Sequence, residues 1–202
     1  MIKGVLPPSL RSFVAIELPQ EIRDGLRATR EQLQTEFPKE SLRWVPLEQI
    51  HLTLAFLGDI SSDSLREMEP VLEKICGACA PLRLCLEGLG CFPNLARPRV
   101  IWLGLTDDLE PLQALQTQIC QATQHWCERA EERSFHPHLT IARLRDVSPR
   151  VARQVGLTVK DASLGSLGEW TPEAVSLMRS TLSPKGAEHE LLSSMSLSSS
   201  QS

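Results

Sequence analysis

The sequence has no long apolar run. No stretch approaches the roughly 18 consecutive apolar residues that a membrane-spanning helix needs. The opening residues 1–9 also lack the apolar run of a secretory signal. We therefore expect a cytoplasmic protein that does not insert into a membrane.

The chain has no excess of positive charge either. It holds 21 Lys and Arg against 25 Asp and Glu, for a formal net charge of −4 and a pI near 5.8. This balance excludes a protein that grips duplex nucleic acid along many phosphates, because such binding depends on a basic surface. Any phosphate that the protein binds must be held locally.

The composition is that of an ordinary globular chain. With 42% hydrophobic and 23% charged residues, it is neither collagen-like, nor a coiled coil, nor disordered for most of its length. A chain of 202 residues buries roughly 70% of its unfolded surface on folding, so it needs no disulfide or structural metal. We expect one domain over residues 1–192.

Cysteine is present without a recognisable pairing pattern. The six positions are Cys76, Cys79, Cys85, Cys91, Cys120 and Cys127. In a chain without a secretory signal, we expect them to be reduced and buried. Cys76 and Cys79 form a C-x-x-C, but no second pair follows at zinc-finger spacing, so structural zinc is only an alternative hypothesis.

Hydrophobic patterning predicts alternating strands and helices through residue 144. Strands are predicted at 11–18, 42–45, 50–57, 82–89, 99–105 and 138–144. Helices are predicted at 22–37, at 61–79, and from the capping pair Asp107-Asp108 through Trp126. The second half of the chain thus repeats the pattern of the first.

The C-terminal part is patterned less clearly. Residues 147–172 carry no assignment, and strands are predicted at 174–182 and 187–192 with a turn at 184–186. Residues 193–202 contain seven serines, so we expect a disordered tail that cannot bury enough apolar area to offset its ordering entropy.

A short motif occurs twice, 87 residues apart. His51-Leu-Thr-Leu-Ala55 matches His138-Leu-Thr-Ile-Ala142 at four of five positions, and both copies fall on predicted strands. Two copies at this distance are too few and too far apart for a solenoid, so they predict two similar lobes facing each other.

Strand geometry places the polar residues of each motif on one face. Side chains alternate along a strand, so His51 and Thr53 point one way, as do His138 and Thr140. If these faces meet across a cleft, two imidazoles and two hydroxyls surround one site. One imidazole can act as base and the other as acid near neutral pH, while hydroxyls hold the charged oxygens, an arrangement that suits phosphodiester cleavage without a metal.

Two other interpretations of the motif remain open. The repeat can be a structural duplication retained for packing alone. Alternatively, His136 and His138 form a His-x-His that could ligate zinc, although no carboxylate or third histidine follows at a compelling spacing.

Beyond the motif, six ordered blocks resemble the two-histidine phosphoesterases, and specifically the RNA 2',3'-cyclic phosphodiesterases, historically called 2'-5' RNA ligases. The blocks are residues 11–19, 43–46, 51–58, 90–93, 97–104 and 135–144. The resemblance covers roughly residues 10–192.

The resemblance implies an α+β fold that is bilobal and pseudo-two-fold, with two antiparallel sheets lining a central cleft and helices on their outer faces. It implies a metal-independent reaction without a cofactor, in which His51 is the proton donor, His138 the proton acceptor, and Thr53 and Thr140 hold the phosphate. The expected product is an RNA end with a 2'-phosphate. Similar proteins also join tRNA halves through 2'-5' linkages, and a monomer is the default expectation.

Further residues are weaker candidates for substrate binding. Phe56 and Arg143 each lie five positions after a motif histidine. The resemblance implies stacking on a base or ribose for Phe56 and phosphate contact for Arg143. Strict alternation turns both away from the histidine face, so these roles require a bulge or a twist. The remaining candidate arginines are Arg11, Arg97 and Arg99, whereas Trp44 and Trp102 are predicted to be core residues and His125 and His189 to be incidental.

Two functions compete with hydrolysis of RNA ends. One is a binding module that recognises RNA ends or nucleotides without turnover. The other is the same chemistry on a small cyclic nucleotide or a 2'-5' oligonucleotide, which the motif residues alone do not distinguish.

Overall fold

A computed structural model describes residues 7–127, 134–183 and 186–197. The strands are β1 (Ser9–Glu17), β2 (Leu42–Trp44), β3 (His51–Ser61), β4 (Leu84–Phe92), β5 (Val100–Thr106), β6 (His138–Leu144), β7 (Glu169–Trp170), β8 (Ala174–Ser183) and β9 (Gly186–Ser196). The helices are α1 (Gln20–Glu36), α2 (Ser62–Gly77), α3 (Leu109–Thr123) and α4 (Pro149–Asp161), with a short 3-10 turn at Leu47–Gln49.

Every predicted strand and helix has its counterpart in the structure. The strand predicted at 138–144 is β6, with the same bounds. The unassigned segment contains α4, which begins where the Ser148 side chain accepts a hydrogen bond from the Val151 backbone N–H and Pro149 occupies the first turn. The turn predicted at 184–186 lies mainly outside the described residues.

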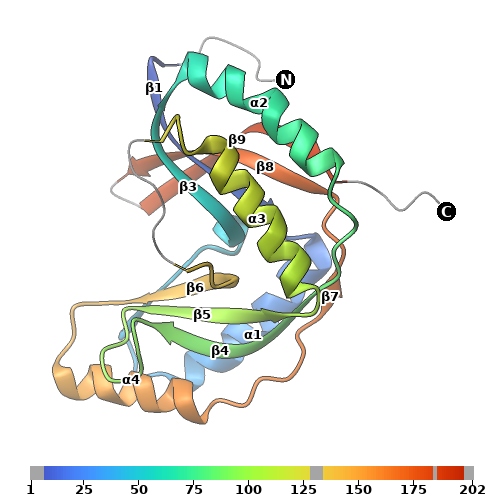
Figure 1. Ribbon diagram of the computed structural model, residues 1–202. Coiled ribbons are helices and arrows are strands. Elements are labelled where there is room, and N and C mark those ends of the chain that lie inside the picture. Colours follow the sequence, from blue (N-terminus) through green and yellow to red (C-terminus); the bar gives the residue numbers. More distant parts are fainter. Residues whose placement is uncertain (1–6, 128–133, 184–185, 198–202) are drawn as a thin grey trace.

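The strands form one curled, antiparallel sheet (Figure 1). Its order is β7-β4-β5-β6-β3-β1-β8-β9, with β2 paired to β6. Among the residues that the structure describes, the two halves of this path are paired at Leu52 of β3 and Leu139 of β6 alone. The two predicted sheets are therefore joined at a single position, which leaves the histidine strands next to each other.

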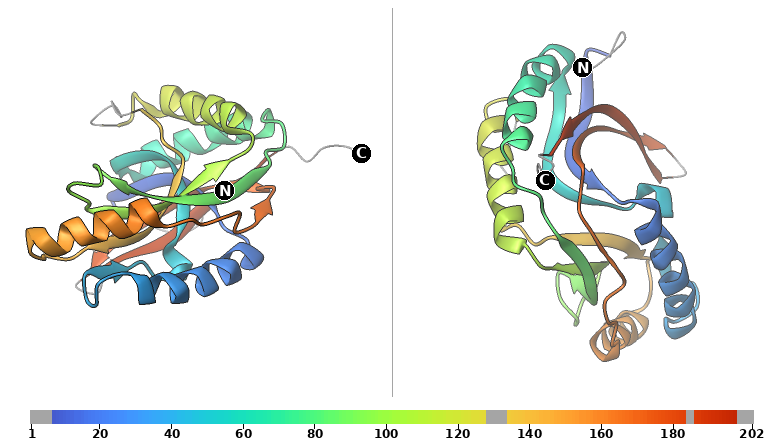
Figure 2. Two further views of the ribbon diagram at one scale, coloured as in Figure 1. Left: turned by 90° about the horizontal axis from the view of Figure 1, so that it is seen from below. Right: turned by 90° about the vertical axis from the view of Figure 1, so that its right-hand side faces the viewer.

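Chain order shows the pseudo-two-fold relation. The succession β1-α1-β3-α2-β4 is repeated as β5-α3-β6-α4-β8, and the last strand of each unit crosses to the other half of the sheet. The helices cross as well: α3 lies against β3, where Gln116 Nε2 donates to the Leu54 carbonyl at 3.3 Å. Figures 1 and 2 show α2 and α3 covering one half of the sheet and α1 and α4 covering the other.

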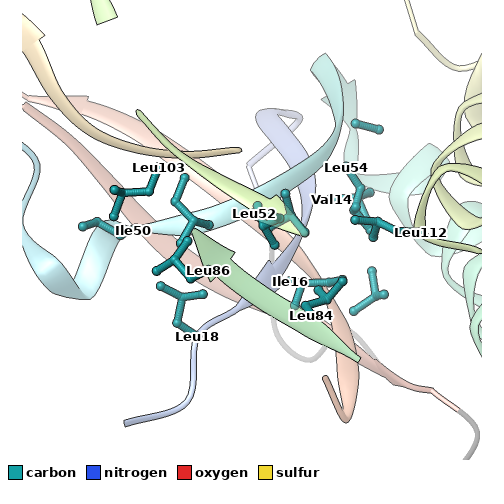
Figure 3. Close-up of a cluster of buried hydrophobic side chains, with 14 of the residues drawn as sticks. Val14, Ile16, Leu18, Ile50, Leu52, Leu54, Leu84, Leu86, Leu103 and Leu112 are labelled. Atoms are coloured by element: carbon teal, nitrogen blue, oxygen red, sulfur yellow. The ribbon is translucent and has the colours of Figure 1, made fainter. Parts of the chain in front are cut away.

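The side of the sheet that the helices cover carries the core, part of which is drawn in Figure 3. Alternate strand residues point into it, among them Val14 and Ile16 of β1, Leu52 and Leu54 of β3, and Leu103 of β5. Since these side chains are almost fully buried, truncating one of the leucines to Ala costs about 2–5 kcal/mol. The opposite, concave face is thereby left for polar and aromatic residues.

The prediction of a disordered tail from residue 193 is wrong for its first five residues. Strand β9 continues to Ser196, and the side chains of Met195 and Leu197 are buried. Ser193 is buried too, and its hydroxyl donates to a carboxylate oxygen of Glu69 on α2. Backbone pairing to β8 orders this serine-rich segment, which composition alone does not reveal. Residues 198–202 lie outside the described part.

Two other expectations concern the whole chain. All six cysteines are free thiols, as predicted, but only Cys76, Cys85 and Cys91 are buried, and the other three are partly buried. Within the described residues, no helix combines the length and the apolar character needed to cross a membrane.

Candidate active site

The two motif histidines occupy equivalent positions at the starts of β3 and β6. His51 Nδ1 lies 2.8 Å from the Gln49 carbonyl oxygen, and His138 Nδ1 lies 2.6 Å from the His136 carbonyl oxygen. Because a carbonyl only accepts, each Nδ1 carries the hydrogen and donates. Nε2 of each ring is therefore left to give or take a proton.

A bulge in β3 turns Phe56 toward the histidine face. Opposite β1, Thr53 pairs with Ala15, but the next pairs are Ala55 with Val14 and Phe56 with Phe13. The extra residue on β3 makes Leu54 and Ala55 consecutive buried positions and reverses the alternation after them. Phe56 thus shares a face with Thr53 and has 57% of its side chain exposed.

The second motif contains the same irregularity. Thr140 pairs with Trp102 of β5, Ala142 with Ile101, and Arg143 with Val100. Ile141 and Ala142 are consecutive buried residues, and Arg143 returns to the face of Thr140. The bulges resolve the conflict between strict alternation and the positions of Phe56 and Arg143.

Aromatic rings hold His51 from two sides. Phe13 stacks on it with ring centroids 4.8 Å apart and planes 26° apart. His189 of β9 meets it edge-on, with centroids 5.0 Å apart. His189 is therefore a site residue and not incidental. No sequence spacing links it to the motifs, because only the curling of β8 and β9 brings it to His51.

His138 has its own aromatic environment. The rings of Phe92 and Trp102 lie with their centroids 5.0 Å and 6.1 Å from the His138 ring. The sequence predicts Trp102 in the core, but it is half-buried and pairs with Thr140 on the histidine face. Trp44 does lie on the opposite face, where it packs against Phe37 at the end of α1.

Both motif histidines are shifted toward the neutral form. Burial, followed by the charge of His189, lowers the pKa of His51 to about 4. Burial is also the main reason that the pKa of His138 is lowered, and the nearby charges of His136 and Arg143 act in the same direction. A negative charge placed beside these rings would favour their cationic form.

The structure also places the remaining candidate residues. Thr53 and Thr140 are half-buried on the histidine face, and Arg11 is exposed on β1 opposite Asp59. Arg97 and Arg99 are exposed in the connection between β4 and β5. His125 packs on Trp126 beyond α3. Across the described ranges, no three His, Cys, Asp or Glu side chains gather in a way that could hold a metal ion, at His136 or elsewhere.

The fold and the paired His-x-Thr strands define a phosphoesterase of the two-histidine class. A family model described as the 2'-5' RNA ligase superfamily matches residues 16–183, and the chain belongs to this superfamily.

Curated relatives match along most of their length. The RNA 2',3'-cyclic phosphodiesterase of Thermus thermophilus is 31% identical over 194 residues, which cover 93% of this chain and 90% of that protein. The protein of the same name from Archaeoglobus fulgidus is 30% identical over 177 residues, covering 88% of this chain and 94% of that protein.

Solved structures match the fold as a whole. The crystal structure of the Thermus thermophilus protein TT0787 superposes with a TM-score of 0.76 at 30% identity, covering 93% of this chain and 98% of that one. Escherichia coli LigT complexed with 3'-AMP gives a TM-score of 0.73 at 27% identity, covering 95% and 99% of the two chains.

Proposed function

We propose that the protein hydrolyses the 2',3'-cyclic phosphate at the end of an RNA strand to a 2'-phosphate. The observation that carries this proposal is the symmetry of His51 and His138, each with Nδ1 tied to a backbone carbonyl and Nε2 free. The names of the curated relatives support the same substrate.

In the proposed reaction, the phosphate sits between the two histidine strands. The hydroxyls of Thr53 and Thr140 donate to its non-bridging oxygens and hold it in line with both imidazoles. Nε2 of neutral His138 takes a proton from water as the water oxygen bonds to phosphorus. The bond from phosphorus to O3' breaks, and Nε2 of protonated His51 gives its proton to O3'. The products are a 2'-phosphate and a free 3'-hydroxyl.

The low pKa of His51 fits a donor that is loaded by its substrate. In the free protein His51 is neutral at pH 7, because burial lowers its pKa to about 4. The negative charge of the bound phosphodiester raises that pKa. His51 therefore carries the proton only when a substrate, with its leaving O3', is bound.

The same groups can run a joining reaction. If the 5'-hydroxyl of a second RNA replaces water, His138 removes its proton and the product is a 2'-5' linkage. The description of the superfamily, which names this activity, favours it as a second function. We propose RNA fragments with cyclic phosphate ends, such as tRNA halves, as partners of a monomeric cytoplasmic enzyme.

The experiment is turnover of a short oligoribonucleotide ending in a 2',3'-cyclic phosphate, in excess EDTA. We expect hydrolysis, and a loss of about a hundredfold or more in His51→Ala and His138→Ala. His125→Ala, the same change far from the motif strands, keeps full activity. Tight binding without turnover in the unaltered protein would instead identify a binding module, and inhibition by EDTA would direct attention to His136 as a metal ligand.

A further inference from the structure

Two arginines lie directly opposite each other on neighbouring strands. Arg43 of β2 pairs in register with Arg143 of β6, between the pairs Leu42 with Leu144 and Trp44 with Ala142. Laterally paired residues point to the same side of a sheet. Arg43 therefore lies on the face that carries Arg143 and Thr140, and both arginines are exposed.

This pairing is unfavourable without an anion. Like charges directly opposite on adjacent strands destabilise a sheet. Neither arginine has an ion pair with any residue that the structure describes, whereas Arg179 on β8 pairs with Glu190 at 3.3 Å. Arg11, the other arginine on a strand of this face, has Asp59 as its register partner.

The segment of β2 that carries Arg43 is anchored on its C-terminal side. The adjacent Trp44 packs against Phe37 on the far side of the sheet, and the guanidinium of Arg30 lies 5.7 Å from the Trp44 ring centroid. The Val45 N–H donates to the Ile141 carbonyl at 2.9 Å, which ties the end of β2 to the bulge of β6. The backbone that carries Arg43 is thus fixed beside the backbone of Arg143.

The pair also lies near the proposed reaction centre. Arg143 is three residues beyond Thr140, and its charge acts on His138. Arg43 lies directly beside Arg143, on the neighbouring strand β2. A cyclic phosphate bound at the histidines carries a single negative charge, so a second guanidinium exceeds what that one phosphate needs.

We propose that Arg43, together with Arg143, binds the phosphodiester on the 5' side of the nucleotide that carries the cyclic phosphate. The inference rests on the proposed function and specifies its substrate class. A 2',3'-cyclic mononucleotide has no such phosphate, whereas every RNA strand end has one. Arg43 thereby makes the site selective for RNA ends over small cyclic nucleotides.

The test compares two substrates: 2',3'-cyclic AMP and a diribonucleotide ending in a 2',3'-cyclic phosphate. Arg43→Gln is expected to lower kcat/KM for the dinucleotide about tenfold or more, because it removes a charge-assisted contact. Turnover of 2',3'-cyclic AMP stays within about twofold. The salt dependence of dinucleotide binding weakens by a slope of about 0.7, as for the loss of one phosphate contact with a single strand.

Matched variants separate this role from a structural one. Arg43→Lys keeps the charge and restores part of the dinucleotide activity, whereas Arg153→Gln, the same change on an exposed position of α4, alters neither substrate. Equal losses on both substrates, or no loss on either, would overturn the inference. If the unaltered protein hydrolyses neither substrate, the proposed function fails instead. Fluorescence anisotropy with a dinucleotide ending in a 2'-phosphate then still decides whether Arg43→Gln weakens binding.

Discussion

The ring of His189 meets the ring of His51 edge-on, with centroids 5.0 Å apart and planes 73° apart. Phe13 contacts both rings, stacking on His51 and lying across the edge of His189. Nδ1 of His189 is buried and has no hydrogen-bond partner among the described residues. At this separation, a positive charge on one imidazole opposes a positive charge on the other.

Replacing His189 by Phe keeps a ring against His51 and removes the opposing charge. The pKa of His51, which is about 4 in the free protein, is therefore expected to rise by about one unit. Glu188 and Glu190 flank His189 along β9 but alternate to the opposite face, where Glu190 pairs with Arg179 of β8. NMR titration of the imidazole resonances measures the shift.

His125→Phe is the matched control, because His125 packs on Trp126 and not on the motif histidines. It should leave the titration of His51 unchanged. An unaltered His51 titration in His189→Phe as well would show that His189 only fills space.

The pH dependence of activity should differ between the free and the substrate-bound enzyme. Both motif histidines have pKa values below 6.5 in the free protein, so the bell-shaped profile of kcat/KM is expected to be centred on the acid side of 6.5. The bound phosphodiester favours protonated imidazole, so the profile of kcat moves to higher pH. The two limbs belong to the coupled pair and not to single residues. A kcat/KM that rises steadily with pH contradicts this arrangement.

Gly90 leaves room for the Trp102 ring, which lies beside His138. A Cβ added at Gly90 overlaps the Trp102 ring, which lies against both Phe92 and His138. Gly90→Ala is therefore expected to displace Trp102, to lower the free energy of unfolding by about 1–3 kcal/mol and to reduce kcat/KM about tenfold or more. Urea denaturation and steady-state kinetics measure the two effects.

The control is Gly77→Ala, where an added Cβ meets no atom within 4 Å. Its stability should stay within about 1 kcal/mol of that of the unaltered protein. Equal behaviour of the two variants would mean that the Trp102 ring moves without cost.

The end of β9 is expected to contribute to stability despite its serines. Met195 is 1% exposed, so Met195→Ala should lower the free energy of unfolding by about 2–5 kcal/mol. Ser196→Ala, at the exposed neighbouring position, serves as the control and should change it by less than about 0.5 kcal/mol. A Met195→Ala variant as stable as the control would show that this segment contributes nothing to stability, as expected of a disordered tail.

Sequence patterns predict the features that depend only on residues close together in the chain. The strand at His138–Leu144 and the pairing of each histidine with a threonine follow from alternation along a strand. The bulges that bring Phe56 and Arg143 to the site do not, because one extra residue in a pair depends on the partner strand.

Long-range contacts account for the remaining differences. His189 reaches His51 only because β8 and β9 fold back along β1, a relation that no spacing in the sequence encodes. Serine-rich composition at 193–196 predicts disorder, but pairing with β8 supplies backbone hydrogen bonds whatever the side chains are. The same dependence on register sets Arg43 beside Arg143.

In the proposed reaction, water attacks phosphorus directly with O3' as the leaving group, and His51 and His138 catalyse the attack. This mechanism is tested most directly by phosphorus NMR of the product formed from a cyclic-phosphate oligoribonucleotide in ¹⁸O-labelled water with excess EDTA. We expect a 2'-phosphate that carries one ¹⁸O atom, formed by the unaltered protein and about a hundredfold or more slowly by His51→Ala and His138→Ala. A 3'-phosphate product, or full turnover by either variant, would contradict this mechanism.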